Sequence, residues 1–436
     1  MYDVIIIGGG PVGLFLGLSL ARQDIEVLVL EAEADIVPSP RALMYFPIVL
    51  HEFEKSGILD DVVEAGYKNQ EGLCFRTPFG GTNEVLAKIP PGEASDGEID
   101  YGVQLAQPEM AGIIRNHALK CPTFTIKYNT RFVDMKEQND TVIVEAQPHI
   151  GENLFYAAQF LVACDGASSS VRKRLDIPFE GLTWDDWRFL AINIKYDFAK
   201  YGYPAANHVI DPEDWAVIVR ASNEKEGLWR IATGIDPKIP VDQIEQHLPA
   251  KLEKLLPGPR PLKYDVVAVN PYWAHERVAK TFTSGRVVLC GDAAHVCNPL
   301  TALGLTTGLI DVAYLSRLLP QAFSTHSPRP WQALLQQYAT LRRKDVINRV
   351  HKQTIEGKMR IHSLDRKVVA QRDDFFNMLN KNPGFGRFIA STMIEKVPDS
   401  LFPSLATRSM NALDGVLKFC RIVPMIIYWK LRSSIL

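Results

Sequence analysis

The sequence has few cysteines, and they follow no pattern. The six cysteines are scattered through 436 residues without a Cys-x-x-Cys pair. Both a disulfide framework and a clustered-cysteine metal site are therefore disfavoured. We expect free, mostly buried thiols in a reducing, cytoplasmic compartment, and we predict no metal site.

Long apolar runs and an excess of charge of one sign are also missing. No stretch reaches the ~18 uncharged apolar residues that cross a bilayer. The apolar start at Val4–Ile7 has no basic region before it, so it favours a strand over an export signal. The net charge is −2, and such a balance gives no indication of a nucleic-acid partner.

One segment near the end of the sequence leaves membrane contact open. Residues Val416–Leu431 combine basic, aromatic and aliphatic side chains, and Pro424 would bend any helix there. Such a segment can lie on a membrane surface. It can equally dock on the protein core as a terminal segment, which is the simpler reading. We therefore expect a cytoplasmic protein, with peripheral membrane association as the alternative.

A glycine-rich turn near the start carries the first chemical signal. A buried strand, Asp3–Ile7, runs into the turn, and a helical pattern begins at Pro11. The next apolar strand ends at Glu31, which completes a βαβ unit. Glycines there permit a tight turn and close approach of a pyrophosphate, while an acid at the end of the second strand binds a ribose hydroxyl. The motif residues are Gly8, Gly10, Pro11 and Gly13.

Two further turns follow buried strands later in the chain. Asp165 and Gly166 come directly after the strand Phe160–Ala163, and Asp292 comes directly after the strand that ends at Cys290. Alone, the pairs Asp165-Gly166 and Gly291-Asp292 are common signals for a turn after a strand. The long stretch of small residues from Gly291 to Asp311 is more specific, because backbone amides there can reach a flat ring before a helix begins.

The order of predicted elements indicates an α/β protein with two interwoven parts. We predict a Rossmann-like dinucleotide-binding domain from residues 1–75, 105–180 and 271–330. Strand-like runs predict a mostly antiparallel β-sheet domain, formed by residues 76–104 and 181–270, that binds the substrate. Residues 331–436 form a predicted helical C-terminal region, and a further helix is predicted over Leu43–Val63.

In their order and spacing the three motifs resemble the flavoprotein aromatic hydroxylases, the para-hydroxybenzoate hydroxylase-like or group A monooxygenases. The similarity covers residues 1–320, and Asn298–Val312 is most similar to fungal polyketide and phenol hydroxylases. The resemblance implies bound FAD, with NADPH or NADH as a transient co-substrate. No second glycine motif is present for a separate nicotinamide domain. Thr301 and Ala302 occupy the positions of two small residues, often glycines, that the family places before its final glycine pair, and Thr301 departs from that pattern because it is β-branched.

The resemblance also implies a role for each matching residue. The glycine turn corresponds to the FAD pyrophosphate site, and Glu31 to the ligand of the adenosine ribose. Asp165 and Gly166 match a motif linked to both FAD and NAD(P)H, and Asp292 matches the ribityl ligand. The remaining matches are Arg41 near the diphosphate, Gln107 at the flavin, and Gly304, Leu305 and Thr306 beside the isoalloxazine ring.

The reaction that the resemblance implies is NAD(P)H- and O2-dependent insertion of one oxygen atom through a flavin C4a-hydroperoxide. The expected substrate is a phenolic or polyketide-type aromatic. An epoxidase or a Baeyer–Villiger monooxygenase acting on a lipophilic natural product is the alternative, and a non-catalytic FAD-binding scaffold is a further one. A flavin halogenase is disfavoured, because no Trp-x-Trp-x-Ile-Pro motif is present.

No catalytic residue follows from the motifs. A base that deprotonates a phenol would help hydroxylation, and the candidates in the sheet domain are His208, Arg220 and Arg230. His295 is expected to be structural, as part of the turn around Asp292. Trp215 and Trp229 could line the substrate pocket, although tryptophans at this spacing more often belong to the core.

Overall fold

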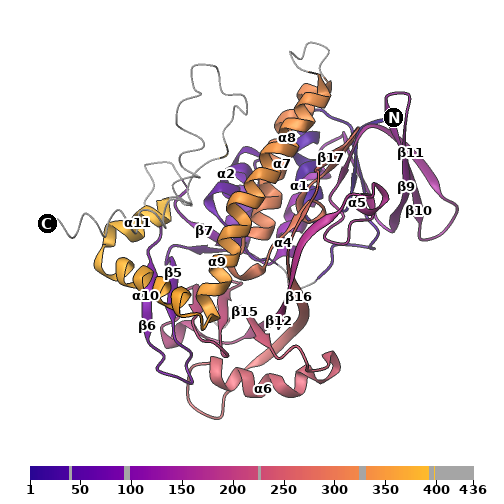
Figure 1. The fold of residues 1–436 in the computed structure, drawn as a ribbon. Helices are drawn as coiled ribbons and strands as arrows, with labels where there is room; N and C mark the ends of the chain where they lie inside the picture. Colours follow the sequence, from indigo (N-terminus) through magenta and orange to yellow (C-terminus); the bar gives the residue numbers. More distant parts are fainter. Residues whose placement is uncertain (39–41, 93–98, 224–226, 324–329, 392–396, 398–436) are drawn as a thin grey trace.

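A computed structural model describes residues 1–38, 42–92, 99–223, 227–323, 330–391 and 397. It contains two large β-sheets, each of eight strands, joined by long strands and crossed by helices (Figure 1). Arg41 and the segment Val416–Leu431 lie outside the described residues. Within the described residues, no helix is both long and apolar enough to cross a membrane.

The first sheet is the predicted Rossmann-like layer. Its centre is parallel, in the order β18-β11-β1-β2-β8, and its strands are almost wholly apolar because helices cover them. Helix α1 packs against α4 and α7 on one face. The elements are β1 (Tyr2–Ile7), α1 (Pro11–Ala21), β2 (Val27–Leu30), α4 (Gln107–Ala118), β8 (Phe124–Lys127), β11 (Leu154–Ala163) and β18 (Val287–Leu289), with β9 (Thr130–Gln138), β10 (Thr141–Pro148) and β17 (Thr283–Ser284) as antiparallel extensions.

The second sheet confirms the predicted antiparallel layer. Its order is β19-β16-β12-β15-β14-β13-β5-β6, and only the pair β13 and β5 is parallel. Strand β16 crosses the domain boundary proposed at residue 270 and continues to Ala279. The elements are β5 (Leu73–Arg76), β6 (Val85–Ile89), β12 (Phe179–Lys195), β13 (Ala206–Val209), β14 (Ala216–Arg220), β15 (Leu228–Ile235), β16 (Asp265–Ala279) and β19 (His295–Val296).

The two faces of the second sheet have different partners. Helix α6 (Ile244–Leu255) covers the outer face, where Leu252 packs in one buried cluster with Ile192 and Ile231 (Figure 1). Because side chains alternate along a strand, the residues next to these, Ala191 and Ala232, point to the opposite face. That face borders a cavity.

The helix predicted over Leu43–Val63 is wrong as a single element. Residues Met44–Tyr45 form a short strand, β3, and Pro47 then starts α2 (Pro47–Lys55) at a position that suits its missing N–H. Gly57, at φ +57°, ends that segment before α3 (Leu59–Ala65). Strand β3 joins a small sheet with β4 (Tyr67–Asn69) and β7 (Gly102–Gln104).

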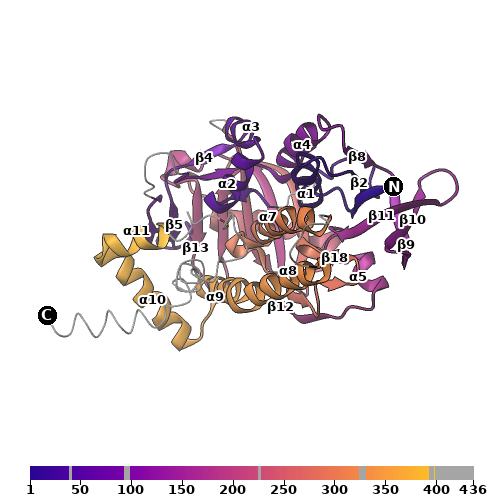
Figure 2. The ribbon, with the colours of Figure 1, turned by 90° about the horizontal axis from the view of Figure 1, so that it is seen from above.

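The C-terminal region is helical as predicted, through the part that the structure describes. Helices α8 (Trp331–Asp345) and α9 (His351–His362) are joined by a π-helical turn into one rod that passes from the first sheet to the second (Figures 1 and 2). Helix α7 (Leu303–Phe323) lies beside α8. Helices α10 (Arg366–Lys381) and α11 (Pro383–Ser391) pack near β6, and a short helix α5 (Ser170–Arg174) follows β11.

Candidate active site

A cavity of about 1790 Å³ lies between the two sheets. Its wall on the first sheet is formed by the turns that follow β1, β11 and β18, through Gly10, Gly166 and Asp292. These turns stand at the carboxyl ends of neighbouring parallel strands, the edge at which open α/β sheets bind ligands. The opposite wall is the inner face of the second sheet, and α9 and α10 close the side.

The glycine turn after β1 has two kinds of glycine. A Cβ on Gly8, whose φ is +104°, would lie 2.4 Å from the carbonyl oxygen of Cys164, and a Cβ on Gly13 would lie 2.0 Å from the carbonyl oxygen of Gly8. These two glycines therefore allow the turn itself to pack. Among the parts of the chain that the structure describes, a Cβ on Gly10 would meet nothing within 4 Å, and Gly10 borders the cavity with Pro11.

Glu31 closes the turn from the next strand. Its Oε2 accepts a hydrogen bond from the Gly9 N–H at 2.5 Å, and its Oε1 accepts one from the Glu33 N–H at 2.8 Å. The carboxylate is thereby fixed directly behind the glycine turn. Glu31 does not border the described cavity itself.

The turns after β11 and β18 are held together by Arg172. Its guanidinium is buried and donates to the carbonyl oxygens of Ala293 at 2.9 Å and Ala167 at 2.8 Å. Arg172 therefore has a buried position that bridges the two turns. Asp165 accepts from the Ser170 N–H at 2.7 Å at the start of α5. It does not border the cavity, whereas the neighbouring Gly166 does.

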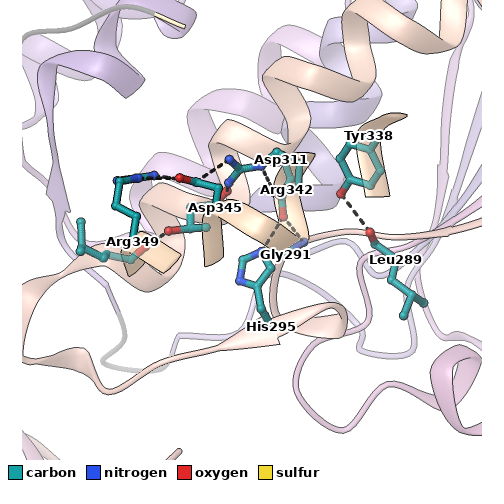
Figure 3. A network of polar contacts seen from close by, with 10 residues as sticks. Leu289, Gly291, His295, Asp311, Tyr338, Arg342, Asp345 and Arg349 are labelled. Carbon is teal, nitrogen blue, oxygen red and sulfur yellow. Dashed lines mark hydrogen bonds and ion pairs between the residues drawn. The ribbon is translucent and has the colours of Figure 1, made fainter. Parts of the chain in front are cut away.

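A buried ionic network lies behind the turn that carries Asp292 (Figure 3). The Oδ2 atom of Asp311 accepts hydrogen bonds from the Gly291 N–H at 3.0 Å and from His295 Nε2 at 2.7 Å. Its Oδ1 atom accepts from Arg342 Nε at 2.6 Å. Burial alone would raise the pKa of Asp311, but His295 and Arg342 hold that pKa below its ordinary value. His295 is thus placed as a structural residue, in agreement with the sequence analysis.

The network continues along α8 to the cavity wall. Arg342 donates to Asp345 Oδ2 at 2.7 Å, and Arg349 binds both oxygens of Asp345, at 2.6 and 2.7 Å. Burial raises the pKa of Asp345, but the two arginines reverse that shift and lower it. Arg349 borders the cavity. The polar chain in Figure 3 therefore fixes α8 to α7 and to the turn before His295.

A glycine on α9 makes room for Thr301, the β-branched residue in the loop before α7. The methyl group of Thr301 sits against Gly357, where an added Cβ would lie only 2.4 Å from it. Ala302 then takes a left-handed φ of +56°, a conformation that costs a residue other than glycine some strain. The following residues, Gly304, Leu305 and Thr306, border the cavity, as does Gln107 at the start of α4.

The inner face of the second sheet forms a flat apolar floor. Val217 on β14 stands between His208 on β13 and Ala232 on β15, and Ala232 in turn pairs with Ala191 on β12. Val219 continues the floor, two residues along β14. All of these residues border the cavity. Small side chains in adjacent register leave a smooth surface of the shape that a planar ring can cover.

Polar groups stand at opposite sides of this floor. Burial and the nearby Arg360 lower the pKa of His208 to about 3, so its ring is neutral at neutral pH. Burial lowers the pKa of Arg230 to about 10, which leaves it charged. Its Nε donates to Asn193 Oδ1 at 2.5 Å. Burial also raises the pKa of Tyr272, which keeps that phenol neutral. Because β14 separates β13 from β15 and Arg230 lies two residues along from the position opposite His208, the backbones of His208 and Arg230 stand about 12 Å apart.

The sequence candidates separate clearly in the structure. His208 and Arg230 border the cavity, but Arg220 does not; it donates to the carbonyl oxygens of Ser222 and Asn223. Trp215 and Trp229 are core residues, 0% and 2% exposed. The sequence analysis did not find Tyr272, Asn270 or Arg360 at the cavity. No local motif marks these residues, because only the pairing of distant strands and helices brings them there.

Known proteins with similar sequences share this architecture. The chain is 38% identical over 319 residues to the para-nitrophenol 4-monooxygenase of Pseudomonas sp. (strain WBC-3), which covers 72% of this chain and 77% of that protein. It is 36% identical over 322 residues to the 6-hydroxy-3-succinoylpyridine 3-monooxygenase HspB of Pseudomonas putida (strain DSM 28022 / S16), covering 73% of this chain and 79% of that protein.

A solved structure extends the likeness to the whole fold. The p-nitrophenol 4-monooxygenase PnpA from Pseudomonas putida DLL-E4 superposes with a TM-score of 0.83 at 34% identity, over 90% of this chain and 97% of that one. The fold, the cavity at the sheet edge and the relatives together define this protein as an FAD-dependent monooxygenase of the aromatic-hydroxylase class. NAD(P)H is the co-substrate typical of its family. The chain belongs to the family described as "FAD binding domain", which matches residues 1–354.

Proposed function

We propose that this enzyme hydroxylates a single-ring phenol at the ring carbon para to the hydroxyl group, where a substituent is displaced. The flat floor of Ala191, Val217, Val219 and Ala232 is the observation that carries the proposal, because it fits a planar ring. The two relatives support the position. Each name places the oxygenated ring carbon para to a hydroxyl group. That carbon carries the nitro group in one substrate and the succinoyl group in the other.

The residues at the sheet edge fit FAD. Gly10 leaves open space in front of α1, whose first turn no side chain caps, so its amides suit a diphosphate. In our proposal the adenosine ribose binds Glu31, the ribityl chain binds Asp292, and the flavin ring lies beside Gly304–Thr306. Gln107 and Gly166 complete the wall. Asp165 acts by shaping its turn, and Arg41 is proposed near the diphosphate. When bound, FAD would accept the hydride from NAD(P)H and would then react with O2.

The protein's own groups orient the ring and set its charge. Arg230 remains charged in a buried position, so it favours the phenolate form of a phenol placed beside it. A phenolate donates electron density to its para carbon, which is the carbon to be oxygenated. His208, neutral and on the far side of β14, faces the para substituent. The apolar floor and the covering helices exclude water.

Turnover of 4-nitrophenol tests the proposed position of oxygen insertion. Each turnover should consume one NAD(P)H and one O2, put one oxygen atom on the ring carbon, and release water, nitrite and para-benzoquinone. Nitrite and NAD(P)H loss should therefore appear in a 1:1 ratio, with the quinone trapped by a thiol. Formation of a nitrocatechol without nitrite would show oxygen insertion at another carbon and would exclude the displacement.

Arg230→Met should raise the apparent pKa of bound 4-nitrophenol by about 1–2 units, because the variant removes the adjacent positive charge. The yellow phenolate band makes this pKa measurable by a difference-spectrum titration on the purified flavoprotein. Arg220→Met is the matched control, since Arg220 lies on the neighbouring strand but outside the cavity. An equal phenol pKa in the two variants would remove Arg230 from this role.

A further inference from the structure

Arg360 is a partly buried cation that lies on the cavity wall, in the last turns of α9. Its guanidinium carbon lies 4.7 Å from the centre of the Phe375 ring, which also borders the cavity. Among the described residues, no hydrogen bond or ion pair to Arg360 is present within 4 Å. Glu356, one turn earlier, attracts it, but burial dominates and lowers the pKa of Arg360.

The surroundings of Arg360 do not neutralise its charge. The groups around it are the Phe375 ring, the Glu356 carboxylate, and His208, whose pKa is lowered first by burial and then by Arg360 itself. Among the described residues Glu356 forms no ion pair with Arg360 within 4 Å, and a partly desolvated charge without a counter-ion in direct contact is unfavourable. The protein therefore holds in this wall an arginine that a bound anion would stabilise.

Helix α9 is fixed firmly enough to hold Arg360 in place. Lys358, which is fully buried, contacts Asp186 Oδ2 on β12 at 2.5 Å. Thr354 donates to Glu276 Oε2 on β16 at 3.1 Å. Gly357 receives the methyl group of Thr301. These anchors join about one turn of the helix, Thr354–Lys358, to the second sheet and to the loop before α7, directly before Arg360, so the guanidinium is positioned before any ligand arrives.

The geometry points to Arg360 as a specificity-determining residue that binds a carboxylate on the substituent para to the substrate's hydroxyl group. This inference rests on the proposed function, because it places the hydroxyl at Arg230 and the substituent at the His208 end of the floor. Arg360 and His208 lie at that end, and the planar fork of an arginine matches a carboxylate with two hydrogen bonds.

The test compares carboxylates with their uncharged amides of the same shape. Isothermal titration calorimetry on the purified flavoprotein would measure the affinities of 4-hydroxybenzoate, 4-hydroxybenzamide, 3-(4-hydroxyphenyl)propionate and its amide. We expect the wild type to prefer at least one carboxylate over its amide by about 10- to 100-fold, the range of a charge-assisted hydrogen-bonded pair. Arg360→Met should abolish the preference, and Arg360→Lys should keep part of it.

The control variant is Arg366→Met. Arg366 is exposed at the start of α10 and does not border the cavity, so this change removes the same charge elsewhere. It should leave the ratio of the carboxylate affinity to the amide affinity as in the wild type. A wild type that binds neither carboxylate, or prefers neither, would overturn the inference, as would an unchanged ratio in Arg360→Met. A loss of folding alone would lower both affinities and leave their ratio unaffected.

The outcome is separable from that of the proposed function. Nitrite release from 4-nitrophenol without any carboxylate preference would retain the hydroxylase proposal and reject the role of Arg360. A carboxylate preference that depends on Arg360, without nitrite release, would retain the binding site and reject displacement of the para substituent.

Discussion

Asp311→Ala should lower the free energy of unfolding by about 3–5 kcal/mol, the usual cost of removing one partner from a buried ion pair. Asp311 is fully buried, and its two oxygens accept hydrogen bonds from Arg342, His295 and the Gly291 N–H. Without the carboxylate, Arg342 keeps its hydrogen bonds to Asp345 and to the Thr307 carbonyl oxygen and its contact with the Tyr314 ring, but loses its bond to Asp311. The turn that positions Asp292 loses its support at the same time.

Urea unfolding followed by tryptophan fluorescence measures this effect, and flavin release followed alongside it reports on the turn. Asp140→Asn is the control, because Asp140 also pairs with an arginine, Arg286, but its side chain is 95% exposed, and asparagine suits the left-handed φ of +60° at this position. Exposed pairs contribute about 0–1 kcal/mol, so the control should unfold almost as the wild type does. Equal losses in the two variants would contradict a supporting role for the buried network.

The turns that we propose to hold FAD could be located from the sequence because their signals are local. A strand, a glycine turn and a helix are adjacent in the chain, so Gly8, Gly10 and Gly13 reveal their geometry directly. The same holds for Asp292 and the loop before α7. Helix periodicity failed over Leu43–Val63, where Pro47 and Gly57 divide the segment and pairing with β7 draws Met44 and Tyr45 into a strand.

The cavity wall on the second sheet, where we propose that the substrate binds, could not be predicted because its residues meet only after the sheets and helices assemble. The floor depends on the register of four strands, in which one residue's shift would turn Val217 and Ala232 away from the cavity. Arg230 and Arg220 are both arginines on adjacent strands, and only the sheet geometry separates them. Arg172 and Arg342 likewise show no local sign that they are buried, since each is held by groups distant in the sequence.

Gly10→Ala should leave the fold intact but weaken FAD binding by about 10- to 100-fold, or about 1.4–2.7 kcal/mol. The backbone at Gly10, with φ −72° and ψ 177°, suits alanine, and the new methyl group would meet no atom of the described residues within 4 Å. That methyl group would instead occupy the cavity side of the turn, where we place the diphosphate. Gly13→Ala differs, because its methyl group would collide with the Gly8 carbonyl oxygen and distort the turn itself.

The measurement pairs apoprotein unfolding with FAD titration by fluorescence quenching. Gly112→Ala is the control: Gly112 lies within α4, also has open space around it, and does not border the cavity. It should stabilise the protein by about 0.5–1 kcal/mol, as alanine does in helices, and leave FAD affinity unchanged. If Gly10→Ala bound FAD as tightly as the control, the diphosphate could not lie against this face of the turn, and Gly10 would serve the turn alone. Weakened binding with unchanged apoprotein stability would separate the glycine that admits the cofactor from the two that allow the chain to turn.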